Sequence, residues 1–312
     1  MYIFMFSVIF PGQGSQLVGM AKEFYHNFEY IKNYFLQADD ILNKNLSKII
    51  LDGPKHELDQ TVNTQPAIFL TSYSIFKVVE KETKFNLKNA KFFSGHSLGE
   101  YSALCCAESI NFEQTINLLK VRSAAMQNAV PDGEGGMLAT LGVKVEDINN
   151  LIEENYNNFQ CYIANDNSIG QVVVSGDKLS LEKLSIELKK KNIKFVNLPV
   201  SAPFHCPLMS KATEQMQNKI LETNFDDPIV EIISNVTANR VDNADKIKNL
   251  LIEQIEKPVR WRESIINIIN YGVKEFIEIG PGKVLSGLVK RIDRNVTLNQ
   301  VNNLEDLKIL ND

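Results

Sequence analysis

The chain has 312 residues, of which 44% are hydrophobic and 23% are charged, as in an ordinary folded protein with one large core or two domains. This composition excludes a disordered chain, a collagen-like repeat and a disulfide scaffold. With 33 Lys and Arg against 38 Asp and Glu, the formal net charge is -5, so the chain lacks the basic surplus of a dedicated nucleic-acid binder.

The few cysteines and histidines show no pattern of a metal site. There are four of each, without a CxxC pair or a zinc-ligand spacing. We therefore expect no metal and a reduced, cytoplasmic environment. The apolar opening Met1 to Phe10 lacks the flanking signals of a leader peptide, and no later run approaches the roughly 20 residues that span a bilayer. The sequence predicts a soluble protein that does not bind a membrane.

Short apolar runs of β type alternate with longer helical patterns, beginning with a buried strand at residues 6–10. This alternation favours an α/β protein with a mostly parallel sheet covered by helices. The further strands expected in this sheet are 91–94, 229–234 and 275–279.

The segment 136–200 has a different pattern of expected strands and helices, in the order βαββαβ of a ferredoxin-like unit. Its expected strands are 137–143, 161–165, 171–175 and 194–198, and its expected helices are 145–155 and 179–192. Segments rich in proline and glycine flank it. We therefore expect a large catalytic domain formed by residues 1–130 and 200–312, with an inserted small domain at 131–199.

Residues 10–16, Phe-Pro-Gly-Gln-Gly-Ser-Gln, follow the first strand and are expected to open a helix. They begin like a dinucleotide fingerprint, but Leu17 stands where the third glycine belongs. The segment 280–283 likewise lacks the spacing and the hydroxyl residue of a P-loop. We therefore expect no nucleotide cofactor. Because this first loop borders the usual site crevice of a parallel sheet, the N–H of Gln13 is a candidate oxyanion donor.

Ser97 is the candidate nucleophile, in the pentapeptide Gly95-His96-Ser97-Leu98-Gly99. The pentapeptide follows an expected strand and precedes an expected helix, which is the context of a nucleophile elbow. Such a turn lifts the serine hydroxyl above the sheet, and the N–H of Leu98 becomes the first candidate oxyanion donor. The pattern alone also arises by chance or as an ordinary strand-to-helix turn.

A serine nucleophile needs a base, and the chain has four histidines, which are His26, His56, His96 and His205. The first two lie in polar stretches, and the third adjoins Ser97 on a sharp turn, where neighbouring side chains point apart. His205 lies in a loop fixed by Pro203 and Pro207, as a positioned base would. Without the elbow, a histidine satisfied in the core would be the preferred interpretation. The neighbouring Cys206 is interpreted as a small buried thiol.

Arg122 lies in the apolar arc of an amphipathic helix at 112–129. A guanidinium there needs a partner, and its planar fork matches a carboxylate. For a lone arginine, an ion pair with a carboxylate of the protein is the commoner outcome. Beside a serine acyl-transfer site, a substrate carboxylate is the favoured partner.

Together these motifs resemble the malonyl-CoA:acyl carrier protein transacylase family of fatty-acid synthesis. The likeness covers nearly the whole chain and depends on several independent motifs in the same order. They are residues 10–16, 95–103, Arg122, 203–209, 234–237, Gln254 with 258–261, and 279–285. The resemblance implies a hydrolase-like large domain with a ferredoxin-like insert, in agreement with the patterns above.

The resemblance also implies an activity and roles. Ser97 would accept malonyl from coenzyme A as an ester and pass it to the phosphopantetheine thiol of acyl carrier protein, with His205 as general base and acid. The backbone carbonyl of Gln254 would orient the histidine, and Arg122 would hold the malonyl carboxylate. The N–H groups of Gln13 and Leu98 would form the oxyanion hole. We expect a monomer without a cofactor.

Two rival functions share these residues. A serine hydrolase or thioesterase would release malonate from malonyl-CoA equally fast without acyl carrier protein. A carrier-protein-binding module without activity would not need Ser97, His205 and Arg122 together. The acyltransferase explains all three residues.

Overall fold

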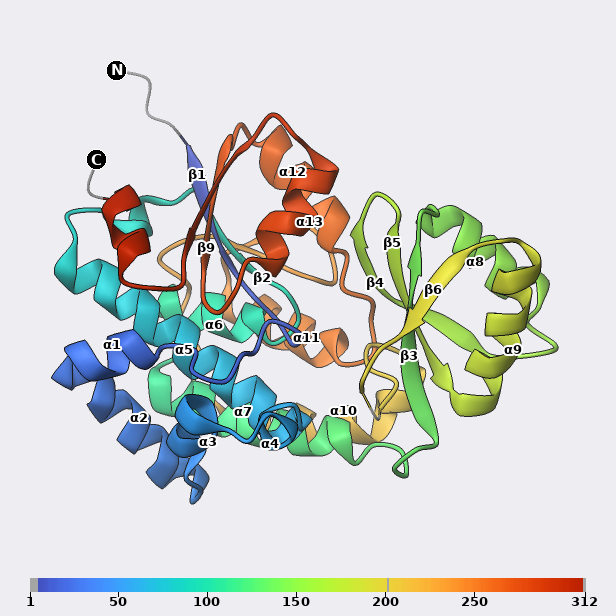
Figure 1. The fold of residues 1–312 in the computed structure, drawn as a ribbon, viewed down its shortest axis with the longest axis horizontal. Helices are drawn as coiled ribbons and strands as arrows, with labels where there is room; N and C mark the ends of the chain where they lie inside the picture. Colours follow the sequence, from blue (N-terminus) through green and yellow to red (C-terminus); the bar gives the residue numbers. More distant parts are fainter. Residues whose placement is uncertain (1–4, 201, 311–312) are drawn as a thin grey trace.

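The computed structural model describes residues 5–200 and 202–310, and Figure 1 shows two parts side by side. The larger part contains a six-stranded sheet with the order β10-β9-β1-β2-β7-β8. Every neighbouring pair in it is parallel except β7 with β8. Its strands are β1 (Phe6–Phe10), β2 (Phe92–Gly95), β7 (Ile232–Ile233), β8 (Arg240–Val241), β9 (Glu275–Ile279) and β10 (Thr297–Val301). The expected α/β class is confirmed.

Strand β1 is buried on both faces, which explains why every residue in it except Ser7 is apolar, and the Ser7 hydroxyl donates to Phe92 O at 2.8 Å. Val8 and Phe10 belong to the core that also holds the side chains of α5 and α6, whereas Ile9 belongs to a second core with α12 and α13. The carboxyl ends of β1 and β2 therefore lie at one edge of a sheet that is covered on both faces.

Helices form the rest of the larger part (Figure 1). They are α1 (Lys22–Asn27), α2 (Glu29–Leu42), α3 (Leu46–Asp52), α4 (Lys55–Leu58), α5 (Thr61–Glu82), α6 (Gly99–Cys106), α7 (Phe112–Gln127), α10 (Ser210–Glu222), α11 (Ala244–Gln254), α12 (Trp261–Asn270) and α13 (Val284–Ile292). Short 3-10 helices cover Leu87–Asn89, Pro207–Met209 and Glu305–Leu310. Helix α5 was not predicted, because it is buried on nearly every side and has no polar face to give a helical period.

The smaller part has the expected order βαββαβ. Its strands are β3 (Gly135–Leu141), β4 (Cys161–Ser168), β5 (Gln171–Asp177) and β6 (Lys194–Asn197), and its helices are α8 (Val145–Glu154) and α9 (Lys178–Lys190). The sheet order is β4-β5-β3-β6, antiparallel throughout, as in a ferredoxin-like unit. Helices α8 and α9 pack on one face, while Met137, Ala139 and Val173 on the other face join the core of the larger part. The boundaries at 131 and 199 stay a prediction.

Two sequence expectations about the large part are wrong in detail. Residues 10–16 do not open a helix: Ser15 N and Met20 N donate to carbonyls three residues earlier, so the segment forms successive turns before α1 begins at Lys22. The strand expected at 229–234 is reduced to Ile232–Ile233. Its first residue pairs elsewhere, because Ile229 N donates to Ala107 O in the loop after α6.

Residues 1–4 of the apolar opening lie outside the described residues. Within 5–200 and 202–310, no helix has the length and apolar character needed to cross a membrane.

Candidate active site

Ser97 lies on a tight turn between β2 and α6. Its φ of 54° is in the left-handed region, which is unfavourable for a serine. Glycine is required on both sides: a Cβ on Gly95 would lie 1.9 Å from Gly99 carbonyl atoms, and a Cβ on Gly99 would lie 2.3 Å from Phe10 O. The predicted nucleophile elbow is therefore present, and β1 packs directly against it.

His205 reaches Ser97 from the loop before α10. Its Nε2 lies 2.8 Å from Ser97 Oγ, and its Nδ1 lies 2.8 Å from the backbone oxygen of Gln254. A carbonyl only accepts, so in the neutral ring Nδ1 carries the proton and Nε2 is free to accept the serine proton. A main-chain oxygen therefore takes the place that a carboxylate has in many serine enzymes.

The environment of His205 keeps its ring neutral. The side chain is buried, and burial together with the positive charge of Arg122 lowers the pKa of His205 to about 3. At neutral pH the ring is therefore ready to take a proton. Of the other histidines, His26 and His56 are exposed, and His96 Nε2 lies 2.8 Å from Asn167 Oδ1 on β4.

Arg122 on α7 is 1% exposed, as its position in the apolar arc predicted. Its Nη1 donates to Gln65 Oε1 at 2.7 Å, and its Nη2 donates to Gln254 Oε1 at 2.9 Å and to Ser97 Oγ at 3.1 Å. Within the described parts of the chain, no carboxylate forms an ion pair with it, and its Nε has no hydrogen-bond partner. The hydrogen-bond acceptors of the guanidinium beside Ser97 are therefore all uncharged, while the buried Glu100 carboxyl acts on it electrostatically without an ion pair.

A cavity of about 90 Å³ connects these groups. Its lining comprises Gln13, Gln65, His96, Ser97, Leu98, Arg122, Met126, Met137, Asn165, Leu198, Val200, Phe204 and His205. Across 5–200 and 202–310, the backbone N–H groups of Gln13 and Leu98 have no hydrogen-bond acceptor. Two unpaired donors therefore line the same space as Ser97, His205 and Arg122.

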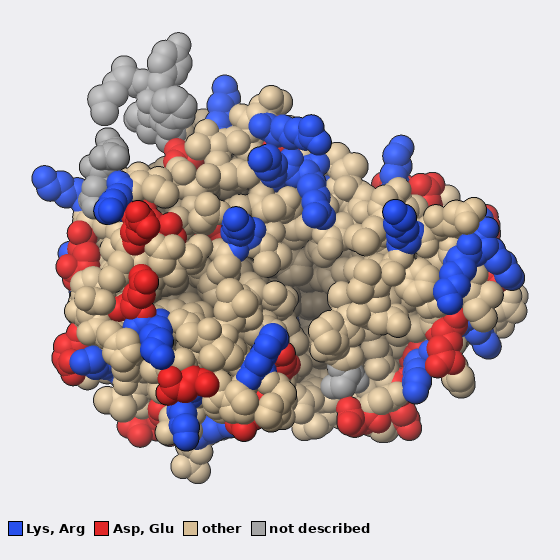
Figure 2. Space-filling view, viewed as in Figure 1, with Lys and Arg blue, Asp and Glu red and all other residues tan. Residues whose placement is uncertain are grey.

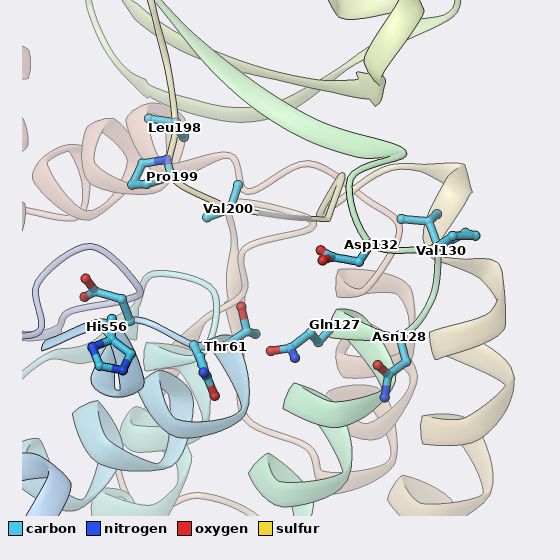
Figure 3. Close-up of a pocket in the computed structure, with 12 residues that line it drawn as sticks. His56, Thr61, Gln127, Asn128, Val130, Asp132, Leu198, Pro199 and Val200 are labelled. Carbon is cyan, nitrogen blue, oxygen red and sulfur yellow. The ribbon is translucent and has the colours of Figure 1, made fainter. Parts of the chain in front are cut away.

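The cavity adjoins a larger cleft of about 880 Å³, and Leu198 and Val200 line both. Figure 3 shows the cleft between α4, α5 and α7 on one side and the chain returning from the small part on the other. Its polar lining includes Thr61, Gln127 and Asn128. A chain-like ligand can therefore extend from the catalytic cavity toward the surface.

The acyl transferase domain family matches residues 7–310. The malonyl CoA-acyl carrier protein transacylase of Bacillus subtilis strain 168 is 41% identical over 306 residues, which cover 96% of this chain and 94% of that protein. This chain belongs to the malonyl-CoA:acyl carrier protein transacylase family. The resemblance expected from the motifs is confirmed.

Solved structures of the family agree. The acyl-carrier-protein-S-malonyltransferase from Bartonella henselae has a TM-score of 0.94 and 40% identity, with 98% of each chain covered. A malonyl-transacylase in complex with its type II PKS acyl-carrier protein has a TM-score of 0.94 and 36% identity, with 98% of this chain and 99% of that chain covered.

Sequence reasoning missed several residues of this transacylase site. Gln65 on α5 holds Arg122, and Glu100, Asn235 and the side chain of Gln254 form a buried polar cluster behind Ser97. Glu100 directly follows the elbow and is a charged residue in a helix with no polar face. This position could have identified Glu100 from the sequence. The partners of Glu100 lie far away in the sequence and were not predictable from spacing.

Proposed function

We propose that Ser97, His205 and Arg122 carry out the malonyl transfer of this acyltransferase, from malonyl-CoA to the phosphopantetheine thiol of acyl carrier protein. The observation that carries the proposal is the convergence of a base and a cation on one hydroxyl: His205 Nε2 and Arg122 Nη2 lie 2.8 Å and 3.1 Å from Ser97 Oγ. The malonyl transfer activity of the family and the position of each of the three side chains support the proposal.

In the first half-reaction, Ser97 Oγ attacks the thioester carbonyl of malonyl-CoA while His205 Nε2 takes the serine proton. A C–O bond forms, and the N–H groups of Gln13 and Leu98 stabilise the resulting oxyanion. The C–S bond then breaks as His205 returns the proton to sulfur. Coenzyme A leaves as a thiol, and malonyl remains as an ester on Ser97.

The second half-reaction repeats these steps in reverse. His205 takes the proton of the carrier-protein thiol, and the sulfur attacks the ester carbonyl. The C–S bond forms, the C–O bond to Ser97 breaks, and the proton returns to Oγ. Gln254 O holds the Nδ1 proton throughout, so one ring orientation serves both directions.

Arg122 selects for the malonyl group. Its guanidinium forms no ion pair with a carboxylate of the described chain, and it lines the same cavity as Ser97. The malonyl carboxylate supplies the missing negative charge in a bidentate geometry that an uncharged acyl group cannot provide.

The direct test is the intact mass of the protein after brief exposure to malonyl-CoA. We expect one malonyl group on Ser97 and none in Ser97→Ala. After the first equivalent, which acylates Ser97, coenzyme A release should be slow without carrier protein and fast with it. Equal release in both would instead indicate a hydrolase, and no adduct would contradict the ester mechanism. The monomeric state, the cytoplasmic location and the absence of a cofactor remain predictions.

We further propose that acyl carrier protein, which the family resemblance implies is acidic, docks beside α13. Lys283, Lys290, Arg291 and Arg294 are exposed there, and none forms an ion pair within the described chain. Figure 2 shows Lys and Arg side chains gathered over α12 and α13, above the hollow between the two parts.

This basic face lies next to the small part, and exposed apolar side chains lie beside it. Arg291 Nη1 donates to Gln171 Oε1 on β5, so the turn between β4 and β5 lies close to α13. Ile169 on that turn is 61% exposed, and Val284 on α13 is 47% exposed. A second lysine cluster, formed by Lys189, Lys190, Lys191 and Lys194, lies where α9 ends and β6 begins, on the far side of the small part (Figure 1).

A further inference from the structure

The side chain of Asn235 bonds to the main chain on both sides of His96. Its Nδ2 donates to Gly95 O at 2.7 Å, and its Oδ1 accepts from Ser97 N at 2.7 Å. Asn235 is completely buried and lies two residues beyond the end of β7. None of the steps proposed above uses it.

This pairing continues the parallel sheet by means of a side chain. Strand β7 pairs with β2 at Ile232 with Phe93 and at Ile233 with Ser94, and then ends. In a parallel ladder, a residue donates to the carbonyl before its partner and accepts from the N–H after it. The Asn235 amide makes these two bonds to the residues flanking His96, while its own backbone N–H donates elsewhere, to Glu100 Oε2 at 3.1 Å.

A second amide holds the other end of the nucleophile. Gln254 Nε2 donates to Ser97 O at 3.1 Å, so both the N–H and the C=O of Ser97 are bonded to buried side chains. Glu100 Oε2 orients both: it accepts from Asn235 N and, at 2.8 Å, from Gln254 Nε2. A left-handed serine persists only where its surroundings enforce that conformation.

We propose that Asn235 is a positioning residue for malonyl transfer. Its amide fixes the backbone of Ser97 so that Oγ points at His205 and the N–H of Leu98 points into the cavity. This inference rests on the proposed role of Ser97. Asparagine suits the position because its side chain carries a planar amide whose nitrogen can donate and whose oxygen can accept in the orientation of a peptide group.

The test compares Asn235→Ala with Asn267→Ala. Asn267 on α12 also gives one amide hydrogen bond to the segment between β7 and β8, from Nδ2 to Ala238 O at 2.8 Å, but it does not touch the elbow. We expect Asn235→Ala to lower the single-turnover rate of Ser97 acylation roughly 10- to 100-fold. The KM for malonyl-CoA should stay near that of the wild type, and Asn267→Ala should keep the wild-type rate.

Equal rates for Asn235→Ala and Asn267→Ala would overturn the proposal, as would a raised KM with an unchanged acylation rate. Labelling of Ser97 by a fluorophosphonate probe gives a second readout that does not depend on malonyl. We expect slower labelling in Asn235→Ala. A wild-type protein that the probe labels but malonyl-CoA does not would contradict the proposed function alone.

Asn235→Asp keeps the proposal testable if the alanine variant fails to fold. A protonated carboxyl offers one donor and one acceptor, whereas a carboxylate would face Gly95 O without a donor. Glu100 and Arg260 are the charged residues that bond to residues 235 and 236, and both are also present in the wild type. The ratio of variant to wild-type acylation rate should therefore rise as the pH is lowered from about 8 to about 5.5. A ratio that is constant or falls would overturn the proposal.

Discussion

Arg122 is a buried cation whose hydrogen-bond acceptors are all uncharged, and this arrangement predicts its response to mutation. Arg122→Ala would leave the malonyl carboxylate buried without its cationic partner. The loss of one partner of such a buried pair costs roughly 2–5 kcal/mol, or tens to thousands of fold in kcat/KM. Acetyl-CoA has no carboxylate, so its transfer should fall little or even rise.

The measurement is kcat/KM for malonyl-CoA and for acetyl-CoA, on the wild type and on Arg122→Ala. A preference that moves toward acetyl-CoA identifies Arg122 as the carboxylate-binding residue. Parallel declines for both substrates, accompanied by a lower Tm, would instead show that Arg122 supports the structure through Gln65 and Gln254.

Glu100 is 2% exposed, and burial raises its pKa from the ordinary 4.5 to about 7, despite the hydrogen bonds that it accepts. The folded state therefore holds the proton more tightly than the unfolded state. Its contribution to stability is complete below about pH 4.5 and is lost as the pH rises through about 7.

Glu100→Gln removes this titration and keeps an oxygen acceptor. We expect the free energy of unfolding of the variant minus that of the wild type to be larger at about pH 8.5 than at about pH 5. Urea unfolding of both proteins at both pH values measures it. A difference that does not change with pH would mean that the Glu100 carboxyl has the same pKa in both states.

At the scale of elements, two glycines predict opposite effects of the same substitution. At Gly95 a Cβ would overlap the carbonyl of Gly99, whereas at Gly287 on α13 it would meet nothing within 4 Å. We expect Gly287→Ala to stabilise the protein by about 0.5–1 kcal/mol, because alanine is the better helix former. Gly95→Ala should prevent folding or abolish Ser97 acylation. Thermal unfolding and acylation assays test both, and a Tm increase for Gly95→Ala would contradict the elbow geometry.

The elements that could be predicted from the sequence carry their own local signals. Strand β1, the elbow and the βαββαβ order follow from continuous apolar runs, glycine spacing and flanking prolines. Helix α5 and strand β8 give no such signal. The site divides in the same way: Ser97 and Arg122 stand out by motif and by helical position, while Gln65 and Asn235 become partners of these residues only through contacts between distant segments.

At the scale of the whole molecule, the basic α13 face predicts how the carrier protein binds. Reversing two charges with Lys290→Glu and Arg291→Glu should raise the KM for acyl carrier protein roughly tenfold at low salt, where electrostatic attraction is strongest. The matched control is Lys189→Glu with Lys191→Glu on the far side of the small part, which should leave this KM unchanged. Equal effects of the two pairs, or no effect of either, would rule out α13 as the docking site.

Ser97, His205 and Arg122 line a single cavity of about 90 Å³, so the ester mechanism proposed above places one acyl group at a time on one hydroxyl. Coenzyme A must therefore leave before the carrier thiol enters, and initial rates should give parallel double-reciprocal lines. Free coenzyme A then competes with the carrier protein for the same malonyl-serine and reverses the first step. The rate of carrier loading consequently follows the ratio of malonyl-CoA to free coenzyme A, more than the concentration of malonyl-CoA alone.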